Sequence, residues 1–195
     1  MYRARIILLG ESNAGKTTLM NRLISGKFRE NEQPTIGVDF GTKKTQEDMM
    51  LSIFDLAGQE RFRTVTRAYY RHTAAAVLVC DISKLESLEK LEYWVAQARE
   101  HSGDVPFYLA INKIDLLPTE REVKAEHVNE FISTHKVLRY YYVSARTGCA
   151  VEDLFTRIGQ DLLARAERGE QFEGLKRTES VYLQKEPAQS QSQCC

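Results

Sequence analysis

The stretch Gly10-Glu-Ser-Asn-Ala-Gly15-Lys16-Thr17 decides the fold of this chain. Before it, residues 3–9 form an apolar run with the pattern of a strand, and after it, residues 15–24 have helical periodicity. The spacing matches G-x-x-x-x-G-K-[ST], in which a loop between a strand and a helix wraps its backbone N–H groups around phosphates. This context predicts a site for a nucleoside triphosphate, but the motif alone leaves the base open.

Two side chains of this loop have distinct expected roles. We expect Lys16 to reach the β- and γ-phosphates and Thr17 to offer its hydroxyl to Mg²⁺. The alternative is an ordinary turn with a surface lysine. The residues expected on the phosphate side of the nucleotide are Ser12, Asn13, Ala14, Gly15, Lys16, Thr17 and Thr18.

The rest of the chain alternates between the two periodicities. Buried strands are predicted at residues 50–54, 74–80, 105–111 and 138–143, and helices at residues 87–100, 120–135 and 151–166. Strands that alternate with helices of this length predict an α/β fold, with a mostly parallel sheet and helices on both faces. In such sheets, ligands bind beyond the carboxyl ends of the strands.

Length, charge and apolar content limit the possible domain organisation, partners and location of the protein. The 195 residues predict one compact domain at residues 1–166, followed by a mobile, polar tail at residues 167–195. The 27 basic and 27 acidic side chains give no net charge, so no nucleic-acid partner is expected. We see no signal peptide and no apolar run long enough to span a bilayer, which predicts a cytosolic protein with reduced cysteines.

A second motif predicts which base is bound. Asn112-Lys113-Ile114-Asp115 follows an apolar strand, so it should lie at the same sheet edge as the phosphate loop. A carboxylate at Asp115 can accept hydrogen bonds from two adjacent N–H donors of guanine, an arrangement that adenine lacks. Ser144-Ala145-Arg146, after the next strand, is placed to add a backbone N–H to the guanine carbonyl. Together these residues favour GTP or GDP over ATP.

These motifs resemble those of the Ras superfamily, and within it the Rab GTPases, over about residues 5–166. The resemblance implies a small G-protein domain of the P-loop NTPase class with a six-stranded sheet. It implies that Thr35 ligates Mg²⁺ and contacts the γ-phosphate, and that Asp55 holds Mg²⁺ through water. In Asp55-Leu-Ala-Gly58-Gln59-Glu60, the Gly58 amide would contact the γ-phosphate and Gln59 would orient the attacking water. Phe28 would pack on the base.

The Rab assignment depends on four features. They are Ile36-Gly-Val-Asp-Phe40, Arg61-Phe-Arg-Thr64, Tyr69-Tyr-Arg71 and the terminal pair Cys194-Cys195. The pair matches the pattern for geranylgeranyl attachment and implies a protein on the cytosolic face of an intracellular membrane, active in vesicle trafficking. The implied partners are an exchange factor, a GTPase-activating protein, effectors, a GDP-dissociation inhibitor and a Rab escort protein.

Four positions depart from the Rab pattern. Phe54 and Leu56 stand where Rab proteins usually have tryptophan and threonine, and His72-Thr73 replaces a usual Gly-Ala. In this family, switch I is the segment with Thr35 and switch II the segment with Gly58 and Gln59. The change at Phe54 would alter the surface between these switches, where effectors of the family dock, without touching the phosphate chemistry.

Hydrolysis is expected to be slow. No arginine precedes Thr35 in Asn31-Glu-Gln-Pro34, so the intrinsic rate should be on the order of 10⁻⁴ to 10⁻³ s⁻¹, and an arginine from a partner should raise it. Two alternatives are a P-loop kinase, which would leave Asp115 and the cysteine pair unexplained, and a binding module that holds GTP with little hydrolysis, which Leu56 suggests.

Overall fold

The computed structural model describes residues 1–30, 32–46, 48–57 and 68–177. Its helices are α1 (Lys16–Ser25), α3 (Leu85–Glu89), α4 (Leu91–Ser102), α5 (Ala125–His135) and α6 (Val151–Glu167), with a 3₁₀ turn at Pro118–Glu120. The strands are β1 (Tyr2–Leu9), β2 (Val38–Gln46), β3 (Met49–Leu56), β4 (Ala75–Asp81), β5 (Phe107–Asn112), β6 (Arg139–Tyr142) and β7 (Leu175–Arg177).

These strands form one sheet in the order β2-β3-β1-β4-β5-β6, with β7 paired to β1. The pairs β1–β3, β1–β4, β4–β5 and β5–β6 are parallel, and β2–β3 and β1–β7 are antiparallel. The predicted mostly parallel α/β sheet is therefore confirmed. Because the parallel strands β1, β3, β4, β5 and β6 all end at one edge, the loops that follow β1, β5 and β6 meet there.

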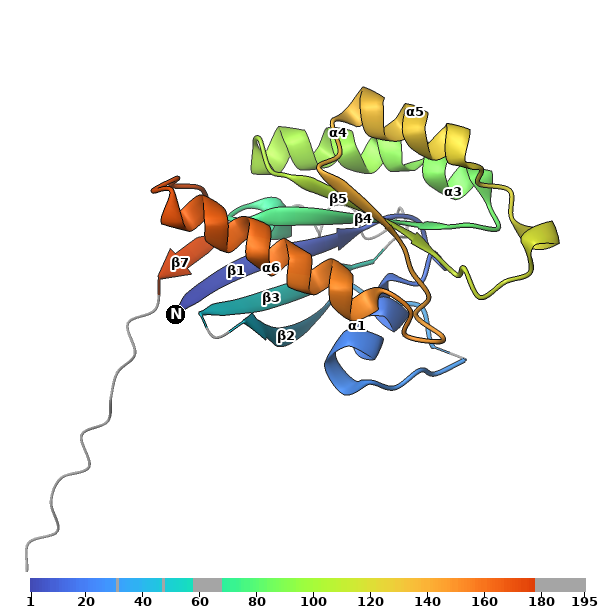
Figure 1. Cartoon of the computed structure of the whole chain (residues 1–195), viewed down its shortest axis with the longest axis horizontal. Helices are drawn as coiled ribbons and strands as arrows, with labels where there is room; N and C mark the ends of the chain where they lie inside the picture. The colour runs from blue at the N-terminus through green and yellow to red at the C-terminus, as the bar shows by residue number, and fades with distance from the viewer. Residues whose placement is uncertain (31, 47, 58–67, 178–195) are drawn as a thin grey trace, which may run out of the picture.

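Helices cover both faces of the sheet (Figure 1). The core on one face contains Ile6 and Leu8 of β1 with buried residues of α1 and α6, and the core on the other contains Ile7 and Leu9 with buried residues of α4 and α5. Successive side chains of a strand point to opposite faces, so β1 contributes to both cores. All seven residues of β4 are buried, as expected of a central strand with helices on both sides.

The elements differ from the sequence prediction at several places. The helix predicted at residues 87–100 is divided into α3 and α4 at Lys90. The helix predicted from residue 120 begins only at Ala125, because the backbone amides of Glu122 and Val123 instead donate to the carbonyl of Ile82. The apolar pattern did not locate β2, whose sequence VDFGTKKTQ has little hydrophobic alternation.

The segment 168–177 also differs from the expected mobile tail. It folds back along the sheet, where β7 pairs with the start of β1 and the Arg5 amide donates to the carbonyl of Gly174 at 2.9 Å. The predicted six strands are thus joined by a seventh. In the part of the chain that the structure describes, no helix has the length and apolar character needed to cross a membrane.

Candidate functional site

The phosphate loop connects β1 to α1, and the Lys16 side chain lies against the backbone of this loop. The Lys16 ammonium donates to the carbonyls of Gly10 at 2.9 Å and Glu11 at 3.0 Å, and the side chain is buried. Burial lowers the pKa of Lys16, although the carboxylates of Asp55 and Glu11 oppose this shift. A buried cation next to a helix N-terminus favours a bound anion, as expected for a phosphate site.

Hydrogen bonds from the side chain of Asn112, at the end of β5, hold the phosphate loop in place. Its side-chain amide donates to the carbonyl of Ala14 at 3.0 Å, and its carbonyl oxygen accepts from the Ala145 amide at 3.1 Å. This close approach requires glycine at position 15, where φ is 91° and a Cβ would lie 2.4 Å from the Asn112 amide nitrogen. Asn112 therefore joins three loops that the sequence could only place at one sheet edge.

Three oxygen-bearing side chains converge beside this loop. The Thr17 hydroxyl donates to Asp55 at 2.5 Å and lies 2.6 Å from the Thr35 hydroxyl, and the Thr35 hydroxyl donates to the same Asp55 oxygen at 3.2 Å. The other oxygen of Asp55 is buried without a hydrogen-bond partner in the described residues. Burial raises the pKa of Asp55, although Lys16 and the two threonines oppose this effect.

This arrangement fits a magnesium ion. Mg²⁺ prefers oxygen ligands and usually takes only one or two carboxylates from the protein, together with waters and substrate phosphates. A cation here would also engage the orphaned Asp55 oxygen and keep the buried carboxyl ionised. Within the described ranges, no cluster of three or more His, Cys, Asp or Glu side chains could hold a metal elsewhere.

A cavity of about 390 Å³ adjoins the phosphate loop, a size typical of small-molecule sites. Its walls contain Phe28, Asp115 and Arg146, with Asn13, Gly15, Thr18 and Lys113 on the side of the loop. The Ser144 hydroxyl donates to one Asp115 oxygen at 2.6 Å and accepts from the Thr147 amide at 3.0 Å. This orients the carboxylate toward a ligand in the cavity.

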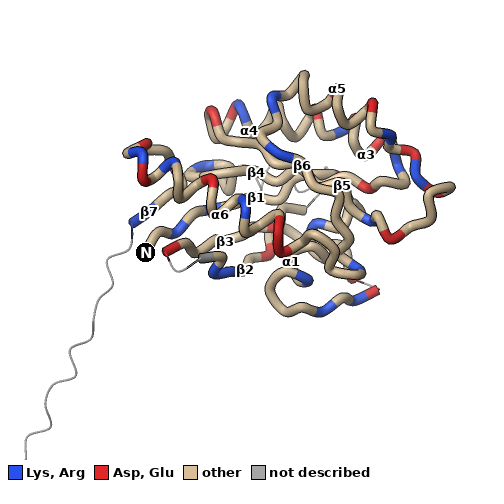
Figure 2. The backbone as a smooth tube through the Cα atoms, in the orientation of Figure 1, with Lys and Arg blue, Asp and Glu red and all other residues tan. Residues whose placement is uncertain are grey.

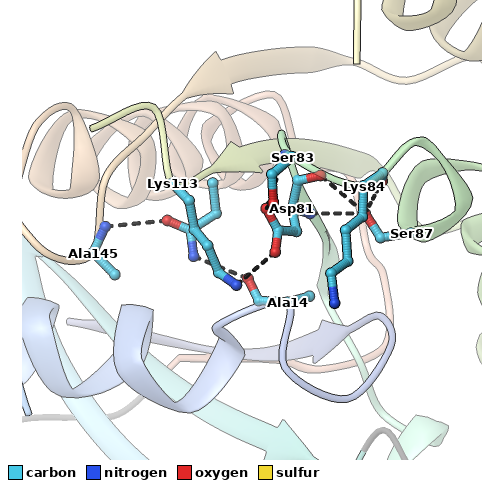
Figure 3. A network of polar contacts seen from close by, with 8 residues as sticks. Ala14, Asp81, Ser83, Lys84, Ser87, Lys113 and Ala145 are labelled. Atoms are coloured by element: carbon cyan, nitrogen blue, oxygen red, sulfur yellow. Dashed lines mark hydrogen bonds and ion pairs between the residues drawn. The ribbon is translucent and has the colours of Figure 1, made fainter. Parts of the chain in front are cut away.

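Lys113 takes its position from a residue that sequence reasoning missed (Figure 3). Its ammonium donates to the carboxylate of Asp81 at 2.5 Å, and Ser83 donates to the other Asp81 oxygen at 2.7 Å. Burial alone would raise the pKa of Asp81, but the hydrogen bonds from Lys113 and Ser83 hold it below its usual value. Asp81 ends β4 at the same sheet edge, so the strand-end rule that found Asp115 could have found it.

Two further side chains, Arg22 and Trp94, form hydrogen bonds to the loops of the site. Arg22 of α1 donates to the carbonyls of Ala145 at 2.8 Å and Gly26 at 2.6 Å, and also to the carbonyl of Arg146. The indole N–H of buried Trp94 donates to Glu11 of the phosphate loop at 3.3 Å. No local signal in the sequence indicates either contact.

A sequence model described as the Ras family matches residues 5–164 of this chain. The chain belongs to the Ras family. Among curated relatives, the Ras-related protein Rab-19 of Xenopus laevis is 34% identical over 165 residues, which is 83% of this chain and 77% of the relative. The putative ras-related protein Rab-5B of Dictyostelium discoideum is 40% identical over 163 residues, covering 82% and 75%. Human Ras-related protein Rab-4B is 36% identical over 170 residues, covering 85% and 79%.

The chain is thus a Rab-type small GTPase, a switch that binds guanine nucleotides and hydrolyses GTP. This resolves the choice between a GTPase and a P-loop kinase. The structure brings together the predicted residues of the phosphate loop, Phe28, Thr35, Asp55, Asn112, Lys113 and Asp115, and Ser144, Ala145 and Arg146. The predicted residues Gly58, Gln59, Cys194 and Cys195 lie outside the described residues.

Leu56 does not enter the nucleotide site. Its side chain is fully buried in the core that contains Ile7 and Leu9, and it is not among the residues that line the phosphate pocket in the described part of the chain. The leucine at this position, where Rab proteins usually have threonine, therefore affects the packing of the core of this Rab GTPase and not its nucleotide site.

Proposed function

We propose that this Rab GTPase binds GTP and GDP with Mg²⁺ through the residues described above. The observation that carries the proposal is the convergence of Thr17, Thr35 and Asp55 beside buried Lys16, at the sheet edge that also carries Asp115. Mg²⁺, when bound, offsets charge on the β- and γ-phosphate oxygens. Lys16 then exchanges its loop carbonyls for phosphate oxygens, which stabilise its charge better than neutral acceptors do.

Guanine is selected at the other end of the cavity. The Asp115 carboxylate, oriented by Ser144, accepts from the two adjacent N–H donors of guanine, one at each oxygen, and Phe28 packs on the ring. The Ala145 amide already donates to Asn112, so we assign the backbone N–H for the guanine carbonyl to Arg146. An adenine would leave the Asp115 carboxylate without its donors, which costs binding free energy.

Hydrolysis requires little covalent chemistry from the protein. Gln59 orients the attacking water, and Lys16 neutralises charge that develops on the phosphates. Without an arginine among residues 31–34, directly before Thr35, intrinsic turnover is slow, and a GTPase-activating protein supplies the missing positive charge. Thr35 and Gly58 are held by the γ-phosphate and released when it leaves, so effectors read the nucleotide state.

The membrane role depends on the two terminal cysteines. Cys194 and Cys195 each carry a geranylgeranyl group, because one lipid chain anchors a protein only marginally and two chains anchor it stably. The protein then works on the cytosolic face of an intracellular membrane in vesicle trafficking. An escort protein, a GDP-dissociation inhibitor and an exchange factor complete its cycle.

Single-turnover hydrolysis tests this assignment. Gln59→Leu removes the group that orients the water, so we expect GTP binding to persist while hydrolysis stimulated by an activating protein falls by roughly a hundredfold or more. Gln160→Leu makes the same change on the exposed face of α6 and should hydrolyse GTP like the wild type. Equal stimulated rates in all three proteins would refute the role of Gln59, and a wild type that takes up no GTP or GDP would refute the proposal.

A further inference from the structure

A second cavity of about 390 Å³ lies between α5 and the consecutive helices α3 and α4, which cover the same face of the sheet (Figure 1). None of the residues that line it belongs to the nucleotide site or to the strands β2 and β3. The lining includes two buried apolar side chains and four groups that carry or can carry charge: Leu88, Phe131, Glu89, Glu92, Glu130 and His135.

The rim of this cavity is acidic. Glu89, Glu92 and Glu130 are exposed, and acidic positions, red in Figure 2, occur on α3, α4 and α5. No Lys or Arg is among the residues that line the cavity. In the described part of the chain, no Lys or Arg side chain forms an ion pair with any of these three glutamates. The cavity therefore has unmatched negative charge in a chain whose total charge is zero.

His135 adds a buried polar group that lacks a donor. Only 9% of the residue is exposed, and neither ring nitrogen has a hydrogen-bond partner among the described residues. Burial lowers the pKa of His135, with Glu92 opposing and Arg99 reinforcing the shift, so the imidazole is neutral at neutral pH. A neutral imidazole has one nitrogen that accepts a hydrogen bond, and a buried acceptor without a donor costs free energy.

A guanidinium group matches these features. It has five N–H donors in one plane, so it can donate both to the imidazole and to the Glu92 carboxylate, whose nearest oxygen lies 3.8 Å from the His135 Nε2. The aliphatic part of an arginine side chain can pack on Leu88 and Phe131. A metal ion fits less well, because the described residues contain no cluster of three or more His, Cys, Asp or Glu side chains that could hold one.

Contacts outside the cavity hold its helices in place. The backbone amide of Leu85, at the start of α3, donates to the Glu122 carboxylate at 2.9 Å. At the other end, the Arg99 side chain of α4 donates to the backbone carbonyl of His135 at 2.9 Å and does not contact the ring nitrogens. The cavity is thus formed before a ligand arrives, which reduces the entropy cost of binding.

We propose that this cavity binds an arginine in a basic segment of a partner protein, with the guanidinium on His135 and Glu92 and neighbouring basic side chains on Glu89 and Glu130. The inference goes beyond the nucleotide switch, because the cavity shares no residue with the nucleotide site.

The test uses the full chain loaded with GDP and a fluorescein-labelled pentapeptide with a central arginine, a lysine at each end and alanines between. We expect fluorescence anisotropy to show saturable binding that weakens as salt rises, and no binding of a counterpart in which all three basic residues are glutamates. A version with a central lysine should bind roughly fivefold more weakly, since an ammonium group is a point charge and not a planar fork of donors.

Three variants locate the peptide. Glu92→Gln and Glu130→Gln keep the side-chain shape but remove a charge, so each should weaken binding roughly threefold to tenfold. Glu126→Gln makes the same change at an exposed position of α5 that does not line the cavity, and it should bind like the wild type. His135→Phe keeps a ring against Phe131 but removes the acceptor, so it should abolish the preference for arginine over lysine.

Thermal unfolding separates this role of His135 from a structural one. His135→Phe removes a buried polar group without a partner, so its thermal midpoint should equal or exceed that of the wild type while the preference for arginine is lost. Equal peptide affinity in the wild type and both glutamine variants at Glu92 and Glu130 would overturn the proposal. It would also be overturned if His135→Phe abolished binding of Zn²⁺ but left both peptide affinities unchanged, because the cavity would then hold a metal. Neither result bears on GTP hydrolysis.

Discussion

In the proposed nucleotide site, Asp115 is the side chain that would select the base. Ser144 holds one of its oxygens, and the side chain is exposed to the base cavity. A carboxylate accepts hydrogen bonds at both oxygens, whereas an amide of the same shape accepts at one end and donates at the other. In the proposed site, the choice of base would therefore depend on the two carboxylate oxygens of Asp115.

We expect Asp115→Asn to change the preferred nucleotide from GDP to xanthosine diphosphate. The new amide group would face the N–H donors of guanine, so the affinity for GDP should fall by about a hundredfold or more. Xanthine has a carbonyl where guanine has its amino group and can accept from the amide, so xanthosine diphosphate should gain affinity. Calorimetric titration with both nucleotides measures the exchange, and an unchanged affinity for GDP would remove Asp115 from the base site.

His135 at the end of α5 is a second residue whose environment has a measurable consequence. Its ring packs on Phe131 at 4.4 Å, and both ring nitrogens are buried without a hydrogen-bond partner in the described structure. Burial lowers the pKa of His135, with Glu92 opposing the shift. The unfolded chain therefore takes up a proton at a higher pH than the folded chain does.

This difference predicts a loss of stability in acid. As the pH falls below the unfolded value of about 6.5, the unfolded state binds a proton that the folded state does not, so the free energy of unfolding decreases until the folded pKa is passed. His135→Gln removes this contribution. Denaturant unfolding at pH 7.5 and pH 5.5 should show a smaller decrease for the variant, and identical decreases would contradict the assignment.

At the scale of elements, β7 is the part of the fold that local pattern did not predict. Its three residues have no apolar alternation, and it forms because Gly174 can approach residues 72–74 closely. The strand covers the start of β1 on the side where β4 begins to pair only at Ile6. It thus completes hydrogen bonding of the central strand.

Gly174→Ala should displace β7. The added Cβ meets backbone atoms at 2.3–2.5 Å, and φ is 80°, so we expect a loss of about 2 to 4 kcal/mol or local opening of the strand. Gly169→Ala is the matched control, since φ there is 77° but no atom lies within 4 Å. Hydrogen exchange of the Arg5 amide and thermal unfolding measure the difference. Equal effects of the two substitutions would show that the close approach has no energetic importance.

At the scale of the whole molecule, the nucleotide edge and the exit of the tail lie at opposite ends of β1. The phosphate loop follows Leu9, whereas β7 runs antiparallel to β1 and ends opposite Tyr2. A lipid anchor on the tail would therefore be attached to the end of the domain that does not bind the nucleotide.

We expect both terminal cysteines to be needed for stable anchoring. Cys194→Ser or Cys195→Ser would leave a single lipid chain, which binds bilayers only marginally, so the membrane-bound fraction should fall clearly in each single variant. Cys149→Ser changes an exposed cysteine of the folded domain and serves as the control. Cell fractionation measures the partition. If both single variants kept the wild-type partition, dual lipidation would be ruled out.

The sequence by itself determined the class of fold, the phosphate loop, the guanine motif and the Rab family. Each of these depends on short segments that can be recognised one at a time, such as Gly10 to Thr17, whose spacing and flanking strand are visible locally. Buried strands were found because continuous apolar runs mark them, as in β4 and β5. The short polar strands β2 and β7 lack that signal.

Only the tertiary structure decided how these pieces support one another. Arg22 reaches carbonyls 123 and 124 residues away, and Lys113 finds Asp81 across 32 residues. The pairing of Arg3 with Lys176 depends on the register of two strands from opposite ends of the domain. Such contacts follow from the packing of the whole sheet, because a shift of one residue in register moves every side chain of a strand to the other face.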